Sequence, residues 1–162
     1  MNEHDDRFDD GRSESPNQRA DRNWNDILQE LRVTQTGTQV VAGFLLALAF
    51  QSRFEELDRY QVVVYLVLVT LASLATIIGL ALVSLHRAYF RQRQKARMVS
   101  VGSRLLIVDL VVVGILAVGV AGFVFDIVLG HVAGLVACGV GLLLIFGLWL
   151  VIPWRRRLEK EL

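Results

Sequence analysis

Long uncharged stretches alternate with short charged ones along this chain. An α-helix needs about 20 residues to cross the hydrocarbon of a bilayer, and residues 62–85, 105–125 and 132–152 meet that length with Asp109 as their one charged side chain. A fourth stretch, 33–52, is polar in its first half and apolar in its second. The pattern predicts an all-α fold, a bundle of four transmembrane helices, with a re-entrant or interfacial first segment as the alternative.

The residues ahead of the first apolar stretch have a different character. Residues 1–22 are rich in acids and arginines and poor in aliphatic side chains, which predicts a disordered tail. A membrane domain is predicted over 23–158, followed by a short tail at 159–162. Within it, a short amphipathic helix over 24–32 either lies in the headgroup layer or continues into the first span. Its apolar face consists of Trp24, Ile27, Leu28 and Leu31.

Positive charge is concentrated in two segments. Residues 86–104 contain Lys and Arg but no acid, and further arginines follow the last apolar stretch. Because loops rich in Lys and Arg stay on the cytoplasmic side, both segments are predicted inside, which places both termini in the cytoplasm and the protein in the cytoplasmic membrane. These cations are expected to contact anionic lipid headgroups. They are Arg87, Arg91, Arg93, Lys95, Arg97, Arg155, Arg156 and Arg157.

Composition supports a membrane protein and argues against several other classes. Hydrophobic residues make up 54% and charged residues 20% of the 162 positions, a balance too apolar for an ordinary soluble domain. The net charge of +1 provides no basic excess for nucleic acid, and three histidines with one cysteine do not build a zinc site. The sequence contains no recognisable catalytic motif, so we expect neither an enzyme nor a cofactor nor a metal centre.

Asp109 is the first candidate for chemistry inside the bilayer. Because a charged side chain at membrane depth is costly, an intramembrane acid is a functional hypothesis by default. In one interpretation it is an ion or proton site, where sodium competes with the proton for the carboxylate. In the other it is a structural carboxylate paired with Arg87, Arg104 or a glutamine of the first span.

The polar half of the first span supplies a second candidate. Its polar side chains recur at helical spacing and form one stripe. They are Arg32, Gln35, Thr36 and Gln39, and Gly43 continues the stripe. Such a stripe avoids lipid, so it either lines an ion site beside Asp109 or makes hydrogen bonds between helices. Pairs of small residues also recur with the spacing that permits close helix packing. These pairs are Gly43 and Ala47, Ala75 and Gly79, Ala117 and Ala121, and Gly130 and Gly134.

Four short segments carry a resemblance to a known family. They are LRVTQTGTQ (31–39), GFLL (43–46), FQSRF (50–54) and LHRAYFR (85–91). In these segments, and more broadly from Leu28 to the C-terminus, the chain resembles a family of short actinobacterial membrane proteins of unknown function. Members are often labelled sodium:proton antiporter by automatic naming, and the resemblance implies that activity here without supplying ligand residues.

Two functions from different classes therefore remain. The first is a small sodium:proton exchanger, with Asp109, Gln35, Thr36 and Gln39 as candidate ion or proton ligands. The second is a non-transporting membrane scaffold or accessory subunit, whose charged segments bind partners or anionic lipid. Four helices enclose little space for a solute, so the exchanger interpretation favours a homo-oligomer whose interface the small-residue pairs form.

Overall fold

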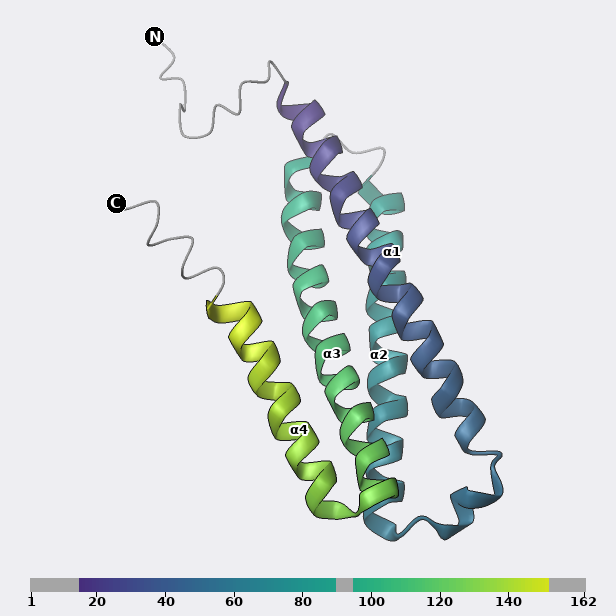
Figure 1. Cartoon of the computed structure of the whole chain (residues 1–162). Coiled ribbons are helices and arrows are strands. Elements are labelled where there is room, and N and C mark those ends of the chain that lie inside the picture. Colours follow the sequence, from purple (N-terminus) through teal and green to yellow (C-terminus); the bar gives the residue numbers. More distant parts are fainter. Residues whose placement is uncertain (1–14, 90–94, 152–162) are drawn as a thin grey trace.

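The computed structural model describes residues 15–89 and 95–151 of the chain. Its helices lie side by side in one elongated bundle, and the described ranges contain no strand (Figure 1). The long helices are α1 (Pro16–Leu48), α2 (Arg59–Tyr89), α3 (Lys95–Leu129) and α4 (His131–Phe146). A 3₁₀ turn, η2 (Ser52–Glu56), connects α1 to α2, and a π-helical turn, η3 (Gly147–Val151), extends α4. The predicted all-α bundle is confirmed.

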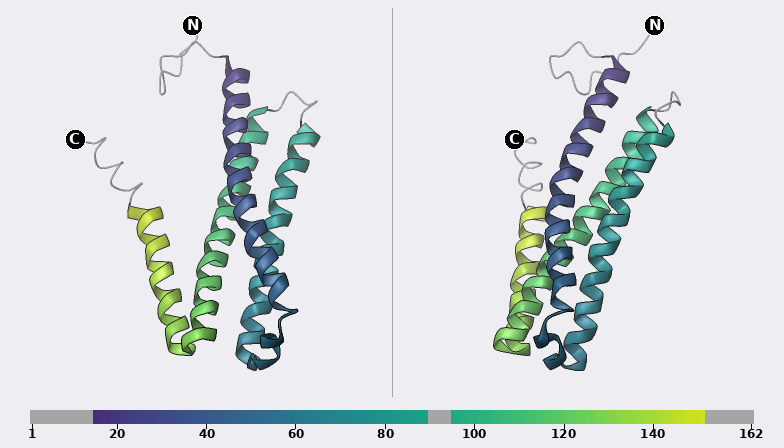
Figure 2. Two further views of the ribbon diagram at one scale, coloured as in Figure 1. Left: turned by 45° about the vertical axis from the view of Figure 1, so that its right-hand side comes forward. Right: turned by 90° about the vertical axis from the view of Figure 1, so that its right-hand side faces the viewer.

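Three of the described helices have the length and apolar composition of a membrane span. They are α2, α3 and α4. Helix α1 is absent from this group because its stretch from Arg32 to Gln39 is polar, although α1 packs along both α2 and α3 (Figure 2). The fourth crossing, the inside position of both termini and the type of membrane stay predictions.

Helix α1 begins earlier than the sequence pattern predicted. Ser15 caps it: its side-chain oxygen accepts from the Gln18 backbone N–H at 3.3 Å, while the Gln18 side chain accepts from the Ser15 N–H at 2.8 Å. This reciprocal capping box, with Pro16 in the first turn, satisfies N–H groups that a helix start otherwise leaves without partners. The predicted disordered tail is therefore wrong for residues 16–22, and residues 1–14 lie outside the described part.

The same helix resolves the alternative that the amphipathic pattern left open. Helix α1 runs without interruption from Pro16 to Leu48, so the amphipathic stretch continues into the predicted first span. Its apolar face packs into a cluster at one end of the bundle, which contains Trp24, Ile27, Leu31, Leu82, Met98 and Leu106. A second cluster fills the other end and contains Leu45, Tyr65, Leu68, Ala72, Leu116 and Phe123.

The basic stretch 86–104 is largely helical. Helix α2 extends to Tyr89 and α3 begins at Lys95, so Arg87 lies at the end of α2, Lys95 and Arg97 lie at the start of α3, and Arg104 lies further along α3. The contacts of Arg87, Lys95 and Arg97 with anionic headgroups stay predictions. The other predicted headgroup contacts lie outside the described residues; they are Arg91, Arg93, Arg155, Arg156 and Arg157.

Helix α4 packs mainly against α3 and diverges from it along its length. The two helices meet at Gly122 and Gly134, where a Cβ on Gly134 would lie 2.8 Å from the Gly122 carbonyl oxygen. Gly130 makes the reversal between them with a φ of 94°, which L-residues with a side chain rarely adopt. Toward its C-terminal end, α4 separates from the rest of the bundle (Figure 2).

Candidate functional site

Asp109 lies on α3 against α1, between the two apolar clusters. Its side chain is fully buried, with 0% exposure. Thr34 of α1 donates its hydroxyl hydrogen to Asp109 Oδ2 over 3.3 Å, and Asp109 Oδ1 has no hydrogen-bond partner in the described part of the chain. A buried carboxylate with one oxygen unsatisfied is costly, and such groups often mark functional sites.

The arginines considered as partners of Asp109 lie elsewhere. Arg87 and Arg104 are exposed, and among the described residues neither forms an ion pair with the carboxylate. Thr34 takes their place, a residue that the sequence reasoning missed. A signal was present, because Ile27, Leu31, Thr34 and Thr38 continue the buried face of α1 at helical spacing.

Gln35 points toward α2. Its side-chain amide nitrogen donates to the Ala75 carbonyl oxygen at 2.9 Å. Gly79 makes room for this side chain, since a Cβ there would overlap with the Gln35 amide. The fully buried Thr38 lies on the same inner side of α1 and donates to the Thr34 carbonyl oxygen at 2.9 Å. Two small residues of α2 thus admit a polar side chain of α1, which links the two helices.

The other candidate ligands of the first span do not lie beside Asp109. Thr36 and Gln39 are exposed on the outer side of α1, and the Thr36 hydroxyl donates to the Arg32 carbonyl oxygen at 2.8 Å. The stripe inferred from the sequence is therefore divided: Gln35 turns into the bundle, and the rest turns outward. The structure brings Asp109, Thr34 and Gln35 into one region and leaves Thr36 and Gln39 outside it.

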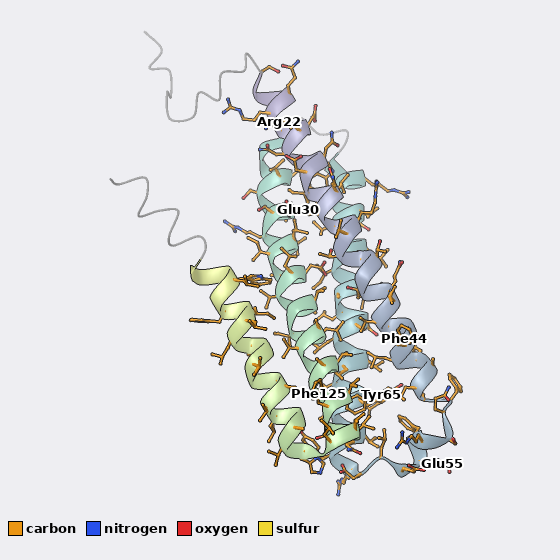
Figure 3. The ribbon with its side chains drawn as sticks, viewed as in Figure 1. Arg22, Glu30, Phe44, Glu55, Tyr65 and Phe125 are labelled. Atoms are coloured by element: carbon orange, nitrogen blue, oxygen red, sulfur yellow. The ribbon has the colours of Figure 1, made fainter. Side chains whose placement is uncertain are left out.

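A groove leads along α1 to this region. It has a volume of about 560 Å³ and is lined by residues of α1 and by one residue of α3. The lining residues are Asp26, Gln29, Glu30, Val33, Thr34 and Leu110. Figure 3 labels Glu30 in the N-terminal half of α1. Thr34 lines the groove and also contacts Asp109, so this one side chain lies between the groove with its two carboxylates and the buried carboxylate. Carboxylates at a groove attract cations.

A second polar cluster lies at the opposite end of α3. Asp126 is only 6% exposed; its Oδ1 accepts from the Gln61 side chain at 2.6 Å, and its Oδ2 lies 2.8 Å from His131 Nδ1. The other ring nitrogen of His131 lies 3.2 Å from Asp58 Oδ2, and the Tyr60 ring packs edge-on against the imidazole. These contacts join the start of α2, the end of α3 and the start of α4.

None of the residues of this cluster was a candidate site residue from the sequence. The two acids facing His131 come from a different connection and from the preceding helix, so only the folded chain brings them together. Asp126 lies 17 positions after Asp109, about 25 Å along a helix at 1.5 Å per residue. The buried α3 side chains between them, Val112, Leu116 and Phe123, are apolar, which separates the two clusters.

The protein is thus a helical bundle that contains membrane-span helices, a buried carboxylate and a groove beside that carboxylate. Within the described residues, no group of three His, Cys, Asp or Glu side chains could hold a metal ion. A model for a family of unknown function, DUF6328, matches residues 13–153, so the chain belongs to this family. No curated protein and no solved structure matched the chain. The resemblance to an uncharacterised family is confirmed; its antiporter label stays a prediction.

Proposed function

We propose that this protein is a multi-pass membrane transporter that exchanges sodium for protons, with Asp109 as the carboxylate that binds both. The observation that carries the proposal is the complete burial of Asp109 with Oδ1 free of hydrogen bonds within the described residues. A carboxylate charge at membrane depth is costly, and a bound proton or a bound cation neutralises it. We place the protein in the cytoplasmic membrane with both termini inside.

The contacts of Thr34 accommodate both protonation states of Asp109. The Thr34 hydroxyl has one hydrogen but lies 2.9 Å from the Leu31 carbonyl oxygen as well as 3.3 Å from Asp109 Oδ2. When the carboxylate is ionised, the hydroxyl donates to it. When the carboxyl is protonated, it donates to the Thr34 oxygen, whose hydrogen then goes to Leu31. Proton binding therefore requires only a hydroxyl rotation.

Cation binding uses oxygens of the same two residues. Hard cations prefer carboxylate, hydroxyl and carbonyl ligands, and Asp109 Oδ1 together with the Thr34 hydroxyl supplies two of these. Asp26 and Glu30 at the groove concentrate cations near Thr34. Because one carboxylate does not hold a proton and a sodium ion at full strength together, binding of one displaces the other, and this competition is the basis of exchange.

Sodium-driven proton flux into proteoliposomes tests the proposal. The purified protein is reconstituted with a pH-sensitive dye inside, and wild type is compared with Asp109→Asn and with Glu55→Gln, an acid-to-amide control in the exposed η2 turn. We expect sodium-dependent flux in wild type and in Glu55→Gln, and none above empty liposomes in Asp109→Asn. Flux that persists in folded Asp109→Asn would overturn the role of this carboxylate.

A second candidate function is a non-transporting scaffold or accessory subunit. The hydrogen bond from Gln35 to Ala75 favours it, because it uses a polar side chain of the first span to join helices. In this case Arg87 and the other cations bind anionic lipid. Well-reconstituted wild type without sodium-dependent flux, combined with a marked gain in thermal stability from anionic lipid, would favour the scaffold.

A further inference from the structure

Helix α1 carries a polar stripe on its outer side. Arg32, Thr36 and Gln39 are exposed and lie three or four residues apart, and Gly43 and Ala47 continue the line. The opposite side of the helix holds the half-buried Thr34 and the buried Thr38 and Leu45, so the stripe points away from α2 and α3. We call these five outer residues the α1 stripe.

The contacts between α1 and α3 place the middle of this stripe at the middle of the apolar segment of α3. Thr34 contacts Asp109, and both helices run in the same direction from there. Five residues further along each helix, Gln39 is level with about Gly114 at equal rise per residue. The apolar segment of α3 extends over Met98–Leu129, so Gln39 lies close to its midpoint.

An exposed carboxamide at this depth requires a partner. Within the described residues the Gln39 side chain makes no hydrogen bond, and none of the other described helices covers the α1 stripe. Lipid tails offer neither donor nor acceptor, so amides at membrane depth bind other polar groups. Neighbouring exposed residues on the flank of α1 are apolar and suit lipid contact; they are Val33, Val40 and Phe44.

We propose that a second copy of this chain covers the α1 stripe, with the two α1 helices crossing at Gln39 and Gly43 about a two-fold axis along the membrane normal. Two copies inserted in the same orientation present the same residue at the same depth. The residue at the axis must therefore complement itself, and a carboxamide does so because it donates and accepts. In this arrangement each Gln39 side chain donates a hydrogen bond to the other and accepts one from it.

The rest of the α1 stripe is compatible with this crossing. A Cβ on Gly43 would have nothing within 4 Å, so the glycine leaves open space on the outer surface where a second helix can approach closely. Arg32 lies nearer the predicted cytoplasmic edge, where a long side chain reaches water and headgroups, so the dimer does not bury two like charges. The proposal is independent of the exchange activity.

Disulfide cross-linking in native membranes tests the geometry. In a Cys138→Ala background, single cysteines replace Gln39 or Gly43 on the stripe, or Val40 on the flank, or Leu143 on α4. We expect oxidation to convert most of the Gln39→Cys and Gly43→Cys proteins to covalent dimers and to leave Val40→Cys and Leu143→Cys monomeric. Efficient dimer formation from Leu143→Cys but not from the stripe would overturn the proposal.

A matched glycine pair tests whether close approach matters. Gly37 and Gly43 are both exposed on α1 with open space around the Cβ position, but only Gly43 lies on the stripe. Because valine fits either site in a single copy, folding of the monomer is preserved, as circular dichroism will check. In single-molecule photobleaching at low protein density, we expect two bleaching steps for wild type and Gly37→Val and at least a tenfold weaker dimer for Gly43→Val.

A third test removes the side-chain amide of Gln39. Gln39→Leu keeps the side chain's approximate volume and is expected to weaken the dimer at least tenfold, while Phe44→Leu on the lipid-facing flank leaves it unchanged. One bleaching step for wild type at all densities would overturn the proposal, as would an unchanged dimer in both Gln39→Leu and Gly43→Val. Cross-links from position 39 exclusively to a different protein would overturn it as well.

Discussion

Thr34 and Asp109 form a hydrogen bond between α1 and α3 in which one hydroxyl hydrogen is shared by two acceptors, Asp109 Oδ2 at 3.3 Å and the Leu31 carbonyl oxygen at 2.9 Å. The contact joins a helix that is only partly apolar to a helix with the composition of a membrane span. It thereby ties the placement of α1 to the buried Asp109, so the stability of the bundle depends on this pair.

Replacement of Thr34 by valine is predicted to destabilise the protein. Valine keeps the shape but removes the hydrogen-bond donor, which leaves the buried Asp109 without a partner among the described residues. We expect a loss of about 1–3 kcal/mol. Thr36→Val is the matched control, because Thr36 is exposed and bonds only to its own helix. Thermal unfolding in detergent micelles compares the two, and an equal effect of both substitutions would contradict the prediction.

The Gln35 side chain and Gly79 form a second testable pair. An alanine at Gly79 would overlap with the Gln35 amide, so Gly79→Ala is predicted to cost about 1–3 kcal/mol through overpacking. In a Gln35→Ala background the space is free, and the same Gly79 substitution is predicted to be nearly neutral. The double-mutant cycle, measured by thermal unfolding, should give a coupling energy of about 0.5–3 kcal/mol. Additive effects would show that the two residues do not compete for one space.

Much of the bundle could be predicted from hydropathy because the period and length of apolar stretches depend on local sequence. The three long apolar stretches became α2, α3 and α4, with most ends shifted by a few residues and the start of α3 ten residues earlier, at Lys95. Asp109 could be singled out because a charge in an apolar stretch is visible without a fold. The start of α1 was misplaced because the capping box at Ser15 lies in a segment whose composition otherwise indicates disorder.

Thr34 was missed as a partner of Asp109 because the partners depend on how α1 is rotated about its axis against α3, and the polar stripe does not define that rotation. Helical spacing groups Arg32 with Thr36 and Gln39 but does not say whether that stripe faces the bundle. The apolar residues of the amphipathic stretch would have decided the rotation, since the face that contains Ile27 and Leu31 also contains Thr34. The cluster at Asp126 requires three helix ends to meet, and no local pattern encodes that meeting.

Asp126 is predicted to contribute more stability than Asp58, although both carboxylates face His131. Asp126 is 6% exposed and also accepts from Gln61, whereas the Asp58 side chain is 47% exposed. We expect Asp126→Ala to cost about 1–3 kcal/mol, because it leaves the Gln61 amide without its acceptor. Asp58→Asn keeps the side-chain oxygen that accepts from the Gln61 backbone N–H at 2.8 Å and removes only the charge. It should cost at most about 1 kcal/mol, the usual range for an exposed ion pair. Chemical unfolding in mixed micelles measures both, and the reverse order would contradict the assigned burial.

Gly130 is predicted to be the glycine least tolerant of alanine for backbone reasons. Its φ of 94° lies in a region that a side chain disfavours, and it forms the one-residue reversal between α3 and α4. We expect Gly130→Ala to cost about 1–3 kcal/mol, the range for a residue held in a sparsely populated conformation.

Gly139 provides the control for Gly130: it lies within α4 with nothing near its Cβ position. Alanine there should be neutral or stabilising by up to about 1 kcal/mol through helix propensity. Because space is open at both glycines, a difference in thermal unfolding temperature between the two variants isolates the backbone effect. Equal tolerance would mean that the reversal relaxes to an ordinary conformation in the membrane-embedded protein.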